Sequence, residues 1–452
     1  MKKPIKRVLV ANRGEIAVRI IRACKELGLE TVQVYSEADR DSLAVQMADH
    51  AICIGPARSA DSYLVAPFIV AAALNFGADA IHPGYGFLSE NAVFRRLCDE
   101  NNLAFIGPSA QAISMMGDKA MARRMAKEAG VPTTPGSDGI IENAGRVKEI
   151  ALTLGYPIIL KAAAGGGGRG MRIIWNEDDI VRHYTDATRE AKACFSDGSI
   201  YVEKYLTKIR HIEIQVLSDG KTVLHLGERD CSIQRRNQKL LEESPSPALD
   251  ATIRTKMGEA AVRLCQHVKY ESAGTIEFIF DETSGQFYFM EMNTRIQVEH
   301  PVTEAITGID IVKQQLRIAQ GESLDINQSD IQFRGHAIEC RINAEDPNNN
   351  FAPSPGTIQL FYAPGGPGIR VDSHLYSGYQ IPPFYDSLLG KIIAWGSTRE
   401  EAIARMRRAL SELRVEGVKT TTEFHEKLLV NEEFRRGHTY TTFVEEVLQE
   451  KQ

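Results

Sequence analysis

The stretch Thr275–Pro301, TIEFIFDETSGQFYFMEMNTRIQVEHP, decides the fold of the region around it. Two apolar runs, Thr275–Phe280 and Phe287–Met292, flank the turn sequence DETSGQ, which is typical of a β-hairpin. Side chains alternate between the two faces of a strand, and Glu277 and Glu291 are placed symmetrically about the turn. The spacing therefore predicts that these two glutamates face each other across antiparallel strands.

Two carboxylates that face each other on a partly buried sheet repel, and each costs several kcal/mol to desolvate in isolation. A divalent cation with oxygen ligands compensates them, and Mg²⁺ characteristically uses one or two carboxylates together with substrate phosphates. The alternative is a pair of solvated glutamates on an exposed face. The bulky aromatic neighbours of Glu277 and Glu291 favour the metal site.

Polar side chains continue beyond the hairpin at every second position: Glu291, Asn293, Arg295, Gln297 and Glu299. If this segment is extended, it spans about 26 Å at ~3.3 Å per residue and forms a polar track that leads away from the metal. The track would carry an anion-binding guanidinium, an amide and a possible general base. A solvated edge strand is the alternative, although Arg and Gln are not typical protectors of sheet edges.

A glycine-rich segment, KAAAGGGGRGM at Lys161–Met171, formally satisfies G-x-G-x-x-G. A dinucleotide-binding fold needs a helix after that motif, whereas MRIIW at 171–175 has the composition of a strand. We therefore predict a strand–glycine–strand hairpin whose backbone N–H groups approach a phosphate, with Lys161 as an added charge. A floppy surface hairpin is the alternative. The Walker A and protein-kinase motifs are absent from the sequence.

The remaining sequence indicates a mixed architecture. Short buried strands at Arg7–Ala11 and Thr31–Tyr35, with a helix at Ile16–Leu27 between them, predict a parallel, doubly wound sheet. The helical patterns that follow it lie at Met115–Ala129 and Thr398–Leu413. Further strands are predicted at 78–81, 104–106, 156–162, 199–202 and 211–217, and the run at 335–340 is strand-like. At roughly 150 residues per domain, the chain length of 452 residues predicts about three domains.

Composition narrows the class of protein. Hydrophobic residues make up 43% and charged residues 25%, which predicts a folded globular chain. A net charge of −6 argues against nucleic-acid binding through bulk positive charge. The longest apolar stretch, 65–74, contains a proline and is too short to span a bilayer, and the basic N-terminus lacks a secretory apolar run. Seven scattered cysteines predict neither disulfides nor a thiolate zinc site, so we expect a cytoplasmic protein without a membrane partner.

Several single residues remain ambiguous on local grounds. Lys239 ends the run QRRNQK, which is either a solvated loop or an anion pocket. Arg341 follows a strand-like run and can point inward, although an arginine on a strand is more often exposed. Lys119 begins a helix, where a lysine is commonly a surface residue. His211 and His300 are more often structural histidines than ligands.

Taken together, the motifs resemble the biotin carboxylases, the ATP-grasp component of the biotin-dependent carboxylases. The resemblance covers essentially the whole chain. It is carried by ANRGEIA (11–17), HPGYGF (82–87), GGGGRG (165–170), ERDCS (228–232), EMNTRIQVEHP (291–301) and ECRINAED (339–346). It implies a Rossmann-like domain at 1–114, an ATP-grasp domain at 115–330 with a mobile lid at about 132–204, and a mixed α/β domain at 331–452.

The resemblance also implies roles for individual residues. ATP would be held by Lys119, Lys161, Gly167, Gly168, Glu203, Lys204, Tyr205, Leu206, His211, Gln234 and Asn237. Mg²⁺ or Mn²⁺ would be bound by Glu277, Glu291 and Asn293. Bicarbonate would be bound by Lys239, Arg295, Gln297 and the Val298 backbone, with Glu299 as its base. Arg341 would face the ureido oxygen of biotin, with Tyr85 nearby.

Two positions depart from the family pattern. Asn237 stands where histidine is common, so we expect altered nucleotide affinity without loss of activity. The family dimerises through the region that matches Arg22, Glu26 and Gly365–Arg370, where an aromatic residue is common at the position of Pro367. A homodimer is expected, with this proline as its weakest point.

The resemblance further implies what the chain works with. No Ala-Met-Lys-Met biotinylation sequence is present. Biotin is therefore expected on a separate carrier protein, with carboxyltransferase subunits as further partners. Acetyl-CoA carboxylase is the favoured complex, and a detached subunit of pyruvate or propionyl-CoA carboxylase is the alternative within the family. A non-biotin ATP-grasp ligase and an ATP-binding regulatory module are the alternatives outside it.

Overall fold

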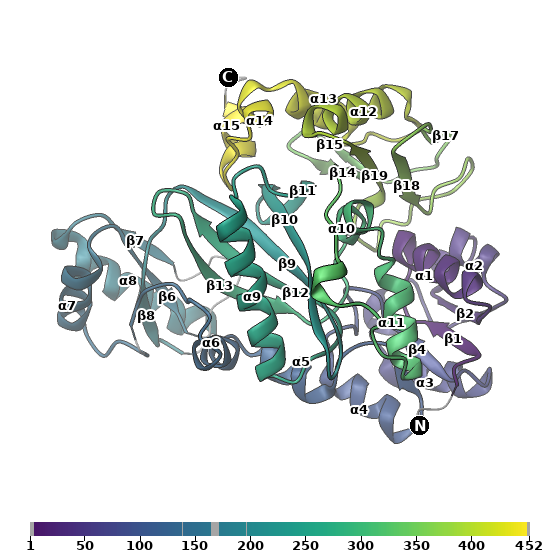
Figure 1. Cartoon of the computed structure of the whole chain (residues 1–452), viewed down its shortest axis with the longest axis horizontal. Coiled ribbons are helices and arrows are strands. Elements are labelled where there is room, and N and C mark those ends of the chain that lie inside the picture. The colour runs from purple at the N-terminus through teal and green to yellow at the C-terminus, as the bar shows by residue number, and fades with distance from the viewer. Residues whose placement is uncertain (1–3, 138, 164–170, 196, 450–452) are drawn as a thin grey trace. The chain divides into compact units, whose positions relative to one another are not determined.

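The computed structural model describes residues 4–137, 139–163, 171–195 and 197–449. The chain divides into two compact units (Figure 1). Unit 1 comprises Met1–Val131, Arg210–Ile279 and Glu291–Gln452, and unit 2 comprises Pro132–Ile209 and Phe280–Met290. No helix among the described residues is long and apolar enough to cross a membrane.

The N-terminal part of unit 1 is a parallel sheet with the strand order β3-β2-β1-β4-β5, which confirms the predicted doubly wound sheet. Successive residues of β1 belong to different cores, because Val8 and Val10 pack on one face while Leu9 packs on the other. Gly28, with φ of +70°, ends the first helix where the pattern predicts. The strands are β1 (Arg7–Val10), β2 (Glu30–Tyr35), β3 (His50–Cys53), β4 (Ala80–His82) and β5 (Ala104–Phe105), and the helices are α1 (Gly14–Glu26), α2 (Leu43–Met47), α3 (Ala66–Asn75) and α4 (Ala92–Glu100).

The predicted helix at 115–129 is wrong in one respect, because the chain forms two helices there. These are α5 (Ala110–Gly117) and α6 (Lys119–Glu128). Asp118 separates them, since its side chain accepts a hydrogen bond from the Met121 backbone N–H at 2.8 Å and so caps α6. Lys119 consequently lies in the first turn of α6, as predicted.

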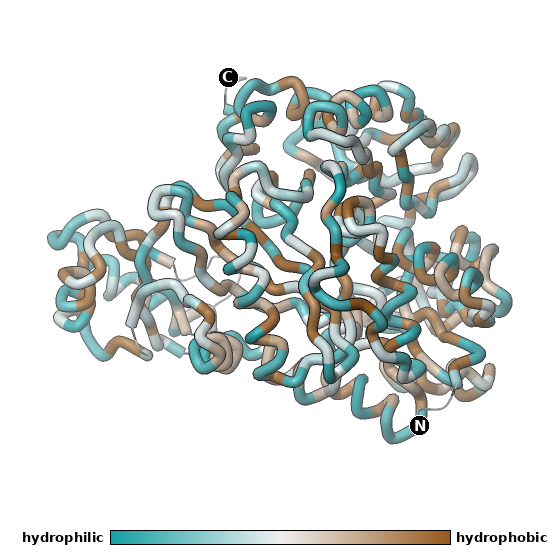
Figure 2. Tube along the Cα trace, in the orientation of Figure 1, coloured by the Kyte–Doolittle hydropathy of each residue, from teal (hydrophilic) through white to brown (hydrophobic). Residues whose placement is uncertain are grey.

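A large sheet of order β13-β12-β9-β10-β11-β14-β19-β18 forms the centre of the fold, and its pairs from β9 to β18 are antiparallel. Figure 2 shows hydrophobic residues recurring along its strands. Its strands are β9 (Ile209–Asp219), β10 (Val223–Arg235), β11 (Gln238–Ser244), β12 (Glu271–Asp281), β13 (Gln286–Asn293), β14 (His336–Asn343), β18 (Ile369–Ser373) and β19 (Leu388–Gly396). The predicted hairpin is present as β12 and β13, which are neighbours joined by a short turn.

Two helices cover opposite faces of this sheet at β14 and β19. Helix α10 (His300–Thr307) packs on Ala337 and Ile393, whereas α12 (Arg399–Glu412) packs on residues such as Ile338 and Ile392. Because strand side chains alternate, Glu339, Arg341 and Lys391 share the face covered by α10. The other helices of unit 1 are α9 (Ala251–His267), α11 (Ile311–Gln320), α13 (Thr422–Val430), α14 (Glu432–Arg436) and α15 (Phe443–Gln449).

The short elements of unit 1 complete its surface. The strands are β15 (Glu345–Asp346), β16 (Ala352–Pro353), β17 (Leu360–Tyr362) and β20 (Arg414–Glu416), which form two small antiparallel pairs, β15 with β16 and β17 with β20. The 3-10 turns of unit 1 are η1 (Glu37–Asp39), η2 (Ser59–Asp61) and η4 (Gln328–Asp330).

Unit 2 is built on a three-stranded antiparallel sheet of order β7-β6-β8. The strands are β6 (Ile158–Ala162), β7 (Arg172–Ile174) and β8 (Ile200–Lys204), and the helices are α7 (Ala144–Leu154) and α8 (Ile180–Phe195), with the turn η3 at Glu177–Asp179. The antiparallel pairing of β6 with β7 confirms the strands predicted on either side of the glycine run. The run itself, with Gly167 and Gly168, lies outside the described residues.

Candidate active site

Lys239 lies at the centre of a buried charge cluster on the large sheet. Its Nζ lies 2.6 Å from Glu213 Oε2, 2.6 Å from Glu299 Oε1 and 3.1 Å from Glu277 Oε1. Burial alone would lower the pKa of Lys239, but the carboxylates, Glu213 and Glu299 foremost, raise it well above its ordinary value. Lys239 is therefore a charged residue inside a pocket of anions, which excludes the solvated-loop interpretation.

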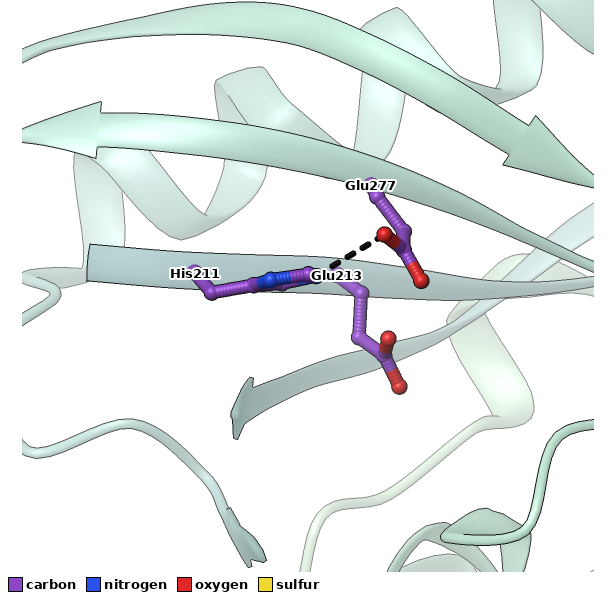
Figure 3. Close-up of side chains that lie close together, drawn as sticks. All are labelled: His211, Glu213 and Glu277. Carbon is purple, nitrogen blue, oxygen red and sulfur yellow. Dashed lines mark ion pairs between the residues drawn. The ribbon is translucent and has the colours of Figure 1, made fainter. Parts of the chain in front are cut away.

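Glu277 receives hydrogen bonds from several directions. Its Oε1 accepts from Asn293 Nδ2 at 2.9 Å and from Gln297 Nε2 at 3.1 Å, and His211 Nε2 lies 3.0 Å from its Oε2 (Figure 3). Burial would raise the pKa of Glu277, but Lys239 and His211 together hold it far below the ordinary value. Glu277 is thus an ionised carboxylate, and His211 is a partner of the site.

Glu291 is the second carboxylate of the hairpin. Burial raises its pKa, and the negative charge of Glu277 raises it further, while Lys119 and His211 act in the opposite direction. The two carboxylates therefore interact unfavourably, as their predicted placement across the strands requires. Two repelling carboxylates beside the amide oxygen of Asn293 are the oxygen donors that Mg²⁺ and Mn²⁺ prefer, so these residues fit a divalent metal.

The predicted extended track after the hairpin is wrong. Strand β13 ends at Asn293, and the chain then turns until α10 begins after Glu299, which occupies the N-cap position without a side-chain capping hydrogen bond. Arg295 folds back, so that its Nη2 donates to Asn293 Oδ1 and its Nη1 to Gln297 Oε1, both at 2.9 Å. The polar side chains converge around Arg295 and Lys239, because the charges of these residues gather the amides and carboxylates into one network.

Arg295 has one partner that the sequence did not indicate. Its Nε donates to Glu90 Oε2 at 2.8 Å, and the same glutamate accepts from the Thr294 backbone N–H at 2.9 Å through Oε1. The guanidinium is mostly buried and is held within the cluster by carboxylate, amide and main-chain oxygens. This fixed planar fork is suited to binding a small planar anion.

Glu299 is fully buried between two cations. Lys239 Nζ lies 2.6 Å from Oε1, and Arg341 Nη2 lies 3.0 Å from Oε2. Burial would raise the pKa of Glu299, but Lys239, Arg341 and Arg229 hold it well below the ordinary value. Glu299 is therefore a carboxylate at neutral pH, and the cations around it determine how strongly it attracts a proton.

Arg341 on β14 is mostly buried, which decides between the two orientations that its sequence position left open. Besides its contact with Glu299, its Nε donates to Glu242 Oε1 at 2.6 Å, and Glu242 pairs across the strands with Glu339. Burial raises the pKa of Glu242 to about 7, although the charge of Arg341 opposes the shift. Arg341 thus holds two buried carboxylates on the face of the sheet covered by α10.

The residues assigned to the nucleotide fall into both units. In unit 2, Lys161 Nζ pairs with Glu203 Oε2 at 2.5 Å, and Lys204 Nζ donates to the Gly155 and Tyr156 carbonyls, both at 3.0 Å. Tyr205 packs edge-on against Trp175, and Leu206 follows it.

In unit 1, strand β10 and the turn that follows it carry one nucleotide residue each, Gln234 and Asn237. Gln234 pairs with Lys239 across the two strands. Arg236 and Asn237 form the turn itself with φ of +50° and +65°, a conformation in which asparagine is favoured. Asn237 is thus a good turn residue at the position where the family commonly has histidine.

Besides Glu90, four site residues were missed by sequence reasoning: Glu213, Arg229, Glu242 and Lys391. Arg229 is fully buried and donates to Glu213 Oε1 at 2.5 Å and to Gln215 Oε1 at 2.7 Å. One signal was available for the first of the four. Polar residues at 211, 213 and 215 alternate with apolar ones along β9, a period of two that indicates a polar face on a buried strand.

The N-terminal parallel sheet, the large antiparallel sheet with its carboxylate hairpin, and the glycine-containing unit define an ATP-grasp ligase. Three family models match the chain: "Biotin carboxylase, N-terminal domain" at residues 4–113, "Carbamoyl-phosphate synthase L chain, ATP binding domain" at 118–327 and "Biotin carboxylase C-terminal domain" at 339–446. The chain belongs to the biotin carboxylase family.

Individual proteins agree with this assignment. The chain is 59% identical to biotin carboxylase 1 of Bacillus subtilis over 443 residues, 98% of each chain. It is 52% identical to a pyruvate carboxylase subunit of Methanothermobacter thermautotrophicus, over 97% of this chain and 89% of that one. It also matches the biotin carboxylase domain dimer of the Hydrogenobacter thermophilus 2-oxoglutarate carboxylase, in complex with MgADP, ADP and bicarbonate, with a TM-score of 0.90, 54% identity and coverage of 99% and 98%.

Proposed function

We propose that this enzyme carboxylates biotin on a carrier protein with ATP and bicarbonate, as the first half-reaction of an acetyl-CoA carboxylase. The observation that carries the proposal is the placement of Glu299 between Lys239 and Arg341. Lys239 also contacts Glu277, which accepts a hydrogen bond from Gln297, the partner of Arg295. Two cations in contact with a buried carboxylate suit a reaction in which a small anion both loses a proton and gains negative charge.

ATP and its metal are assigned by the donor groups available. Glu277, Glu291 and Asn293 would hold Mg²⁺ or Mn²⁺, which neutralises phosphate charge when bound. The solved relative in complex with MgADP and bicarbonate supports this assignment. Lys161 of unit 2 and Lys119 of unit 1 would add positive charge for the phosphates.

Bicarbonate would bind to Lys239, Arg295, Gln297 and the Val298 backbone. Glu299 takes the bicarbonate proton while a bicarbonate oxygen attacks the γ-phosphorus, and the bond from that phosphorus to ADP breaks. The product is carboxyphosphate, which separates into CO₂ and phosphate. Phosphate removes the N1′ proton of biotin, Arg341 stabilises the enolate-like ureido oxygen near Tyr85, and the nitrogen captures CO₂.

The electrostatics of the charge cluster explain how Glu299 gains basicity. Lys239 and Arg341 are the two cations in contact with the Glu299 carboxylate that lower its pKa. When an anionic substrate draws either cation toward itself, Glu299 loses part of that stabilisation and its proton affinity rises. The base is therefore weak in the free enzyme and strengthens when substrate is bound.

Phosphate release from ATP tests the function. We expect turnover that requires bicarbonate and rises on addition of free biotin. A non-biotin ATP-grasp ligase would not respond to biotin, and a regulatory module would bind ATP without turnover. Either result contradicts the proposal.

The acyl acceptor is tested with the purified complex. We expect the co-purifying biotinylated protein and carboxyltransferase to carboxylate acetyl-CoA. The pyruvate carboxylase relative from Methanothermobacter favours pyruvate as the second candidate. Supplying acetyl-CoA, propionyl-CoA and pyruvate separately to the carboxylated carrier distinguishes them, and labelled carboxylate on pyruvate alone would overturn the acetyl-CoA assignment.

We also propose a homodimer, supported by the dimer named for the Hydrogenobacter relative. The predicted interface includes Arg370, whose Nη1 contacts Glu304 Oε2 at 2.6 Å and whose Nη2 contacts Asp372 Oδ2 at 2.7 Å within the same chain. The Gly365 carbonyl accepts a hydrogen bond from Arg408 at 2.8 Å. Sedimentation at several protein concentrations measures the association, and a monomer throughout would contradict it.

A further inference from the structure

We propose that Lys391 is a positioning residue that holds the Val298 main chain and, through Glu15, the Tyr85 hydroxyl. The inference rests on the proposed function, which places bicarbonate at the Val298 backbone and biotin near Tyr85. All four residues belong to unit 1. None of the sequence motifs that point to the chemistry contains Lys391.

Lys391 is fully buried on β19 and pairs in register with Arg341 on the neighbouring strand. A buried ammonium is unfavourable unless it is paired and hydrogen-bonded. Its Nζ donates to the Val298 carbonyl oxygen at 2.7 Å and lies 3.1 Å from Glu15 Oε1. One cation thus joins the main chain of the site to a carboxylate of the N-terminal domain.

The contact with Val298 fixes more than one residue. Val298 lies between Gln297, which donates to Glu277, and Glu299, which contacts Lys239 and Arg341. The segment is irregular, since it lies between the end of β13 and the start of α10. Without regular backbone pairing, the lysine contact restrains the direction in which both side chains leave the main chain.

The contact with Glu15 extends the network to a cavity. Glu15 is buried, and its Oε1 also accepts a hydrogen bond from the Tyr85 hydroxyl. Glu15 and Tyr85 line a cavity of about 200 Å³ together with Asn12 and Asp386, among others. A continuous chain of contacts therefore runs from a cavity-lining hydroxyl through Glu15 and Lys391 to the Val298 carbonyl.

Charge neutralisation alone does not account for this geometry. Besides Glu15, the Asp372 carboxylate attracts Lys391, and Arg370 repels it. A lysine needed only to balance these carboxylates would not have to place its Nζ on a main-chain carbonyl. The contact with Val298 indicates a role in orienting the bicarbonate segment, and the shared Glu15 indicates that a ligand at Tyr85 affects the same segment.

The experiment compares Lys391→Met with Arg399→Met in the full chain. Arg399 is a matched control, because it also pairs with a buried carboxylate, Glu243, and donates to main-chain carbonyls, those of Phe434 and Arg435. For Lys391→Met we expect the bicarbonate KM to rise about tenfold, the scale of a lost charged hydrogen bond, and the stimulation of ATP cleavage by biotin to fall. The ATP KM should stay within about twofold of wild type.

The control should lose thermal stability while keeping the bicarbonate KM and the response to biotin. If Lys391→Met only lowers the melting temperature and leaves both kinetic readouts unchanged, the positioning role is overturned. If Lys391→Met does not fold, the double variant Glu15→Gln/Lys391→Met removes both charges and is judged by the same readouts. Wild-type enzyme without bicarbonate-dependent ATP cleavage would instead refute the proposed function.

The single variant Glu15→Gln tests the Tyr85 end of the network independently of the Val298 end. It keeps the size and one acceptor oxygen of residue 15 but removes the charge that attracts Lys391. We expect reduced stimulation by biotin with a bicarbonate KM close to wild type, because the Val298 contact remains. An unchanged response to biotin would show that Tyr85 and Val298 are not coupled through Glu15.

Discussion

The two units of this enzyme differ in how they hold the lysines that we assign to the active site, Lys239 and Lys161. In unit 1 the Lys239 side chain is 12% exposed and contacts three carboxylates, whereas in unit 2 the Lys161 side chain is 28% exposed and pairs with Glu203. Both lysines lie on strands of antiparallel sheets, Lys239 on β11 and Lys161 on β6. The two lysines therefore differ more in their exposure and in their charged partners than in their secondary structure.

The comparison distinguishes a lysine that is part of the folded structure, Lys239, from a lysine that is accessible to a ligand, Lys161. A buried cation among carboxylates is part of the folded structure, and removal of one partner leaves uncompensated charge in the interior. A partly exposed ion pair contributes little to stability, because water screens it. Substitutions in the unit 1 cluster should therefore affect stability and chemistry together, and those at Lys161 should affect nucleotide binding alone.

The largest effect is expected for Glu299→Gln. The amide cannot accept the bicarbonate proton, so bicarbonate-dependent ATP cleavage should fall by roughly 10²–10⁴-fold, the usual contribution of a general base. Phosphate release under saturating ATP and bicarbonate measures the effect, and a thermal melt reports the accompanying loss of charge balance around Lys239 and Arg341. Near-normal turnover would reject Glu299 as the base.

Arg341→Ala should break the coupling between the two halves of the reaction. ATP cleavage should continue while carboxybiotin formation falls, because the enolate-like oxygen loses its cation. The ratio of phosphate released to carboxybiotin formed measures this, with Arg341→Lys as the control that keeps the charge without the planar fork. Stability should also fall by roughly 3–5 kcal/mol, since Glu242 and Glu299 lose a buried partner. A ratio equal to that of wild type would remove Arg341 from the chemistry.

Lys161→Met and Lys239→Met test the comparison directly. We expect Lys161→Met to raise the ATP KM about tenfold, as for a lost charged contact to phosphate, and to leave the melting temperature nearly unchanged. Lys239→Met should lower the melting temperature clearly, because Glu213, Glu277 and Glu299 then face one another without their shared cation. Equal melting temperatures for the two variants would contradict the view that Lys239 contributes to stability and Lys161 does not.

Local sequence patterns were sufficient to predict the hairpin and the two strands on either side of the glycine run. The apolar runs beside DETSGQ and the strand-like MRIIW are signals contained within a few residues, and β12, β13, β6 and β7 follow them. The prediction of an extended track after Asn293 was wrong. Alternation of polar and apolar residues is equally compatible with a turn whose side chains converge on a buried cation. Period alone does not distinguish these two cases.

The remaining site residues come from pairings between distant strands. Glu242 lies opposite Glu339 and Arg341 lies opposite Lys391, partners separated by tens of residues in sequence. Register of this kind depends on which strands become neighbours, and no local signal in β11 or β19 specifies it. The roles of Arg341 and Tyr85 entered through family resemblance, and the proposed domain boundaries remain predictions.

The smallest effect on activity is expected for Glu339→Gln, which sharpens the description of the unit 1 cluster. Glu339 is fully buried, and neither of its carboxyl oxygens has a hydrogen-bond partner among the described residues. Burial raises its pKa well above the ordinary value, the charge of Lys391 opposes the shift, and Glu242 adds to it. The folded enzyme thus keeps a neutral acid here, which an amide mimics in size and charge.

The sign of the pH dependence follows from this raised pKa. The unfolded chain releases the proton near pH 4.5, while the folded chain retains it, so the stability contributed by this group is complete below pH 4.5 and declines as the pH rises toward the folded pKa. Glu339→Gln cannot ionise and lacks this decline, which amounts to about 1.4 kcal/mol per pH unit for one proton. The melting temperature of Glu339→Gln should therefore rise relative to that of wild type as the pH increases above 4.5.

Glu243→Gln is the matched control on the same sheet. Burial would raise the pKa of Glu243, but Arg399 and His336 lower it to about 2, so its contribution to stability is present above pH 4.5 and is lost as the pH falls through 2. This variant should be less stable than wild type at every pH from 6 to 8. A Glu339→Gln variant that behaves in the same way would show that Glu339 is ionised in the folded enzyme, and the unit 1 cluster would then hold one more negative charge than its cations balance.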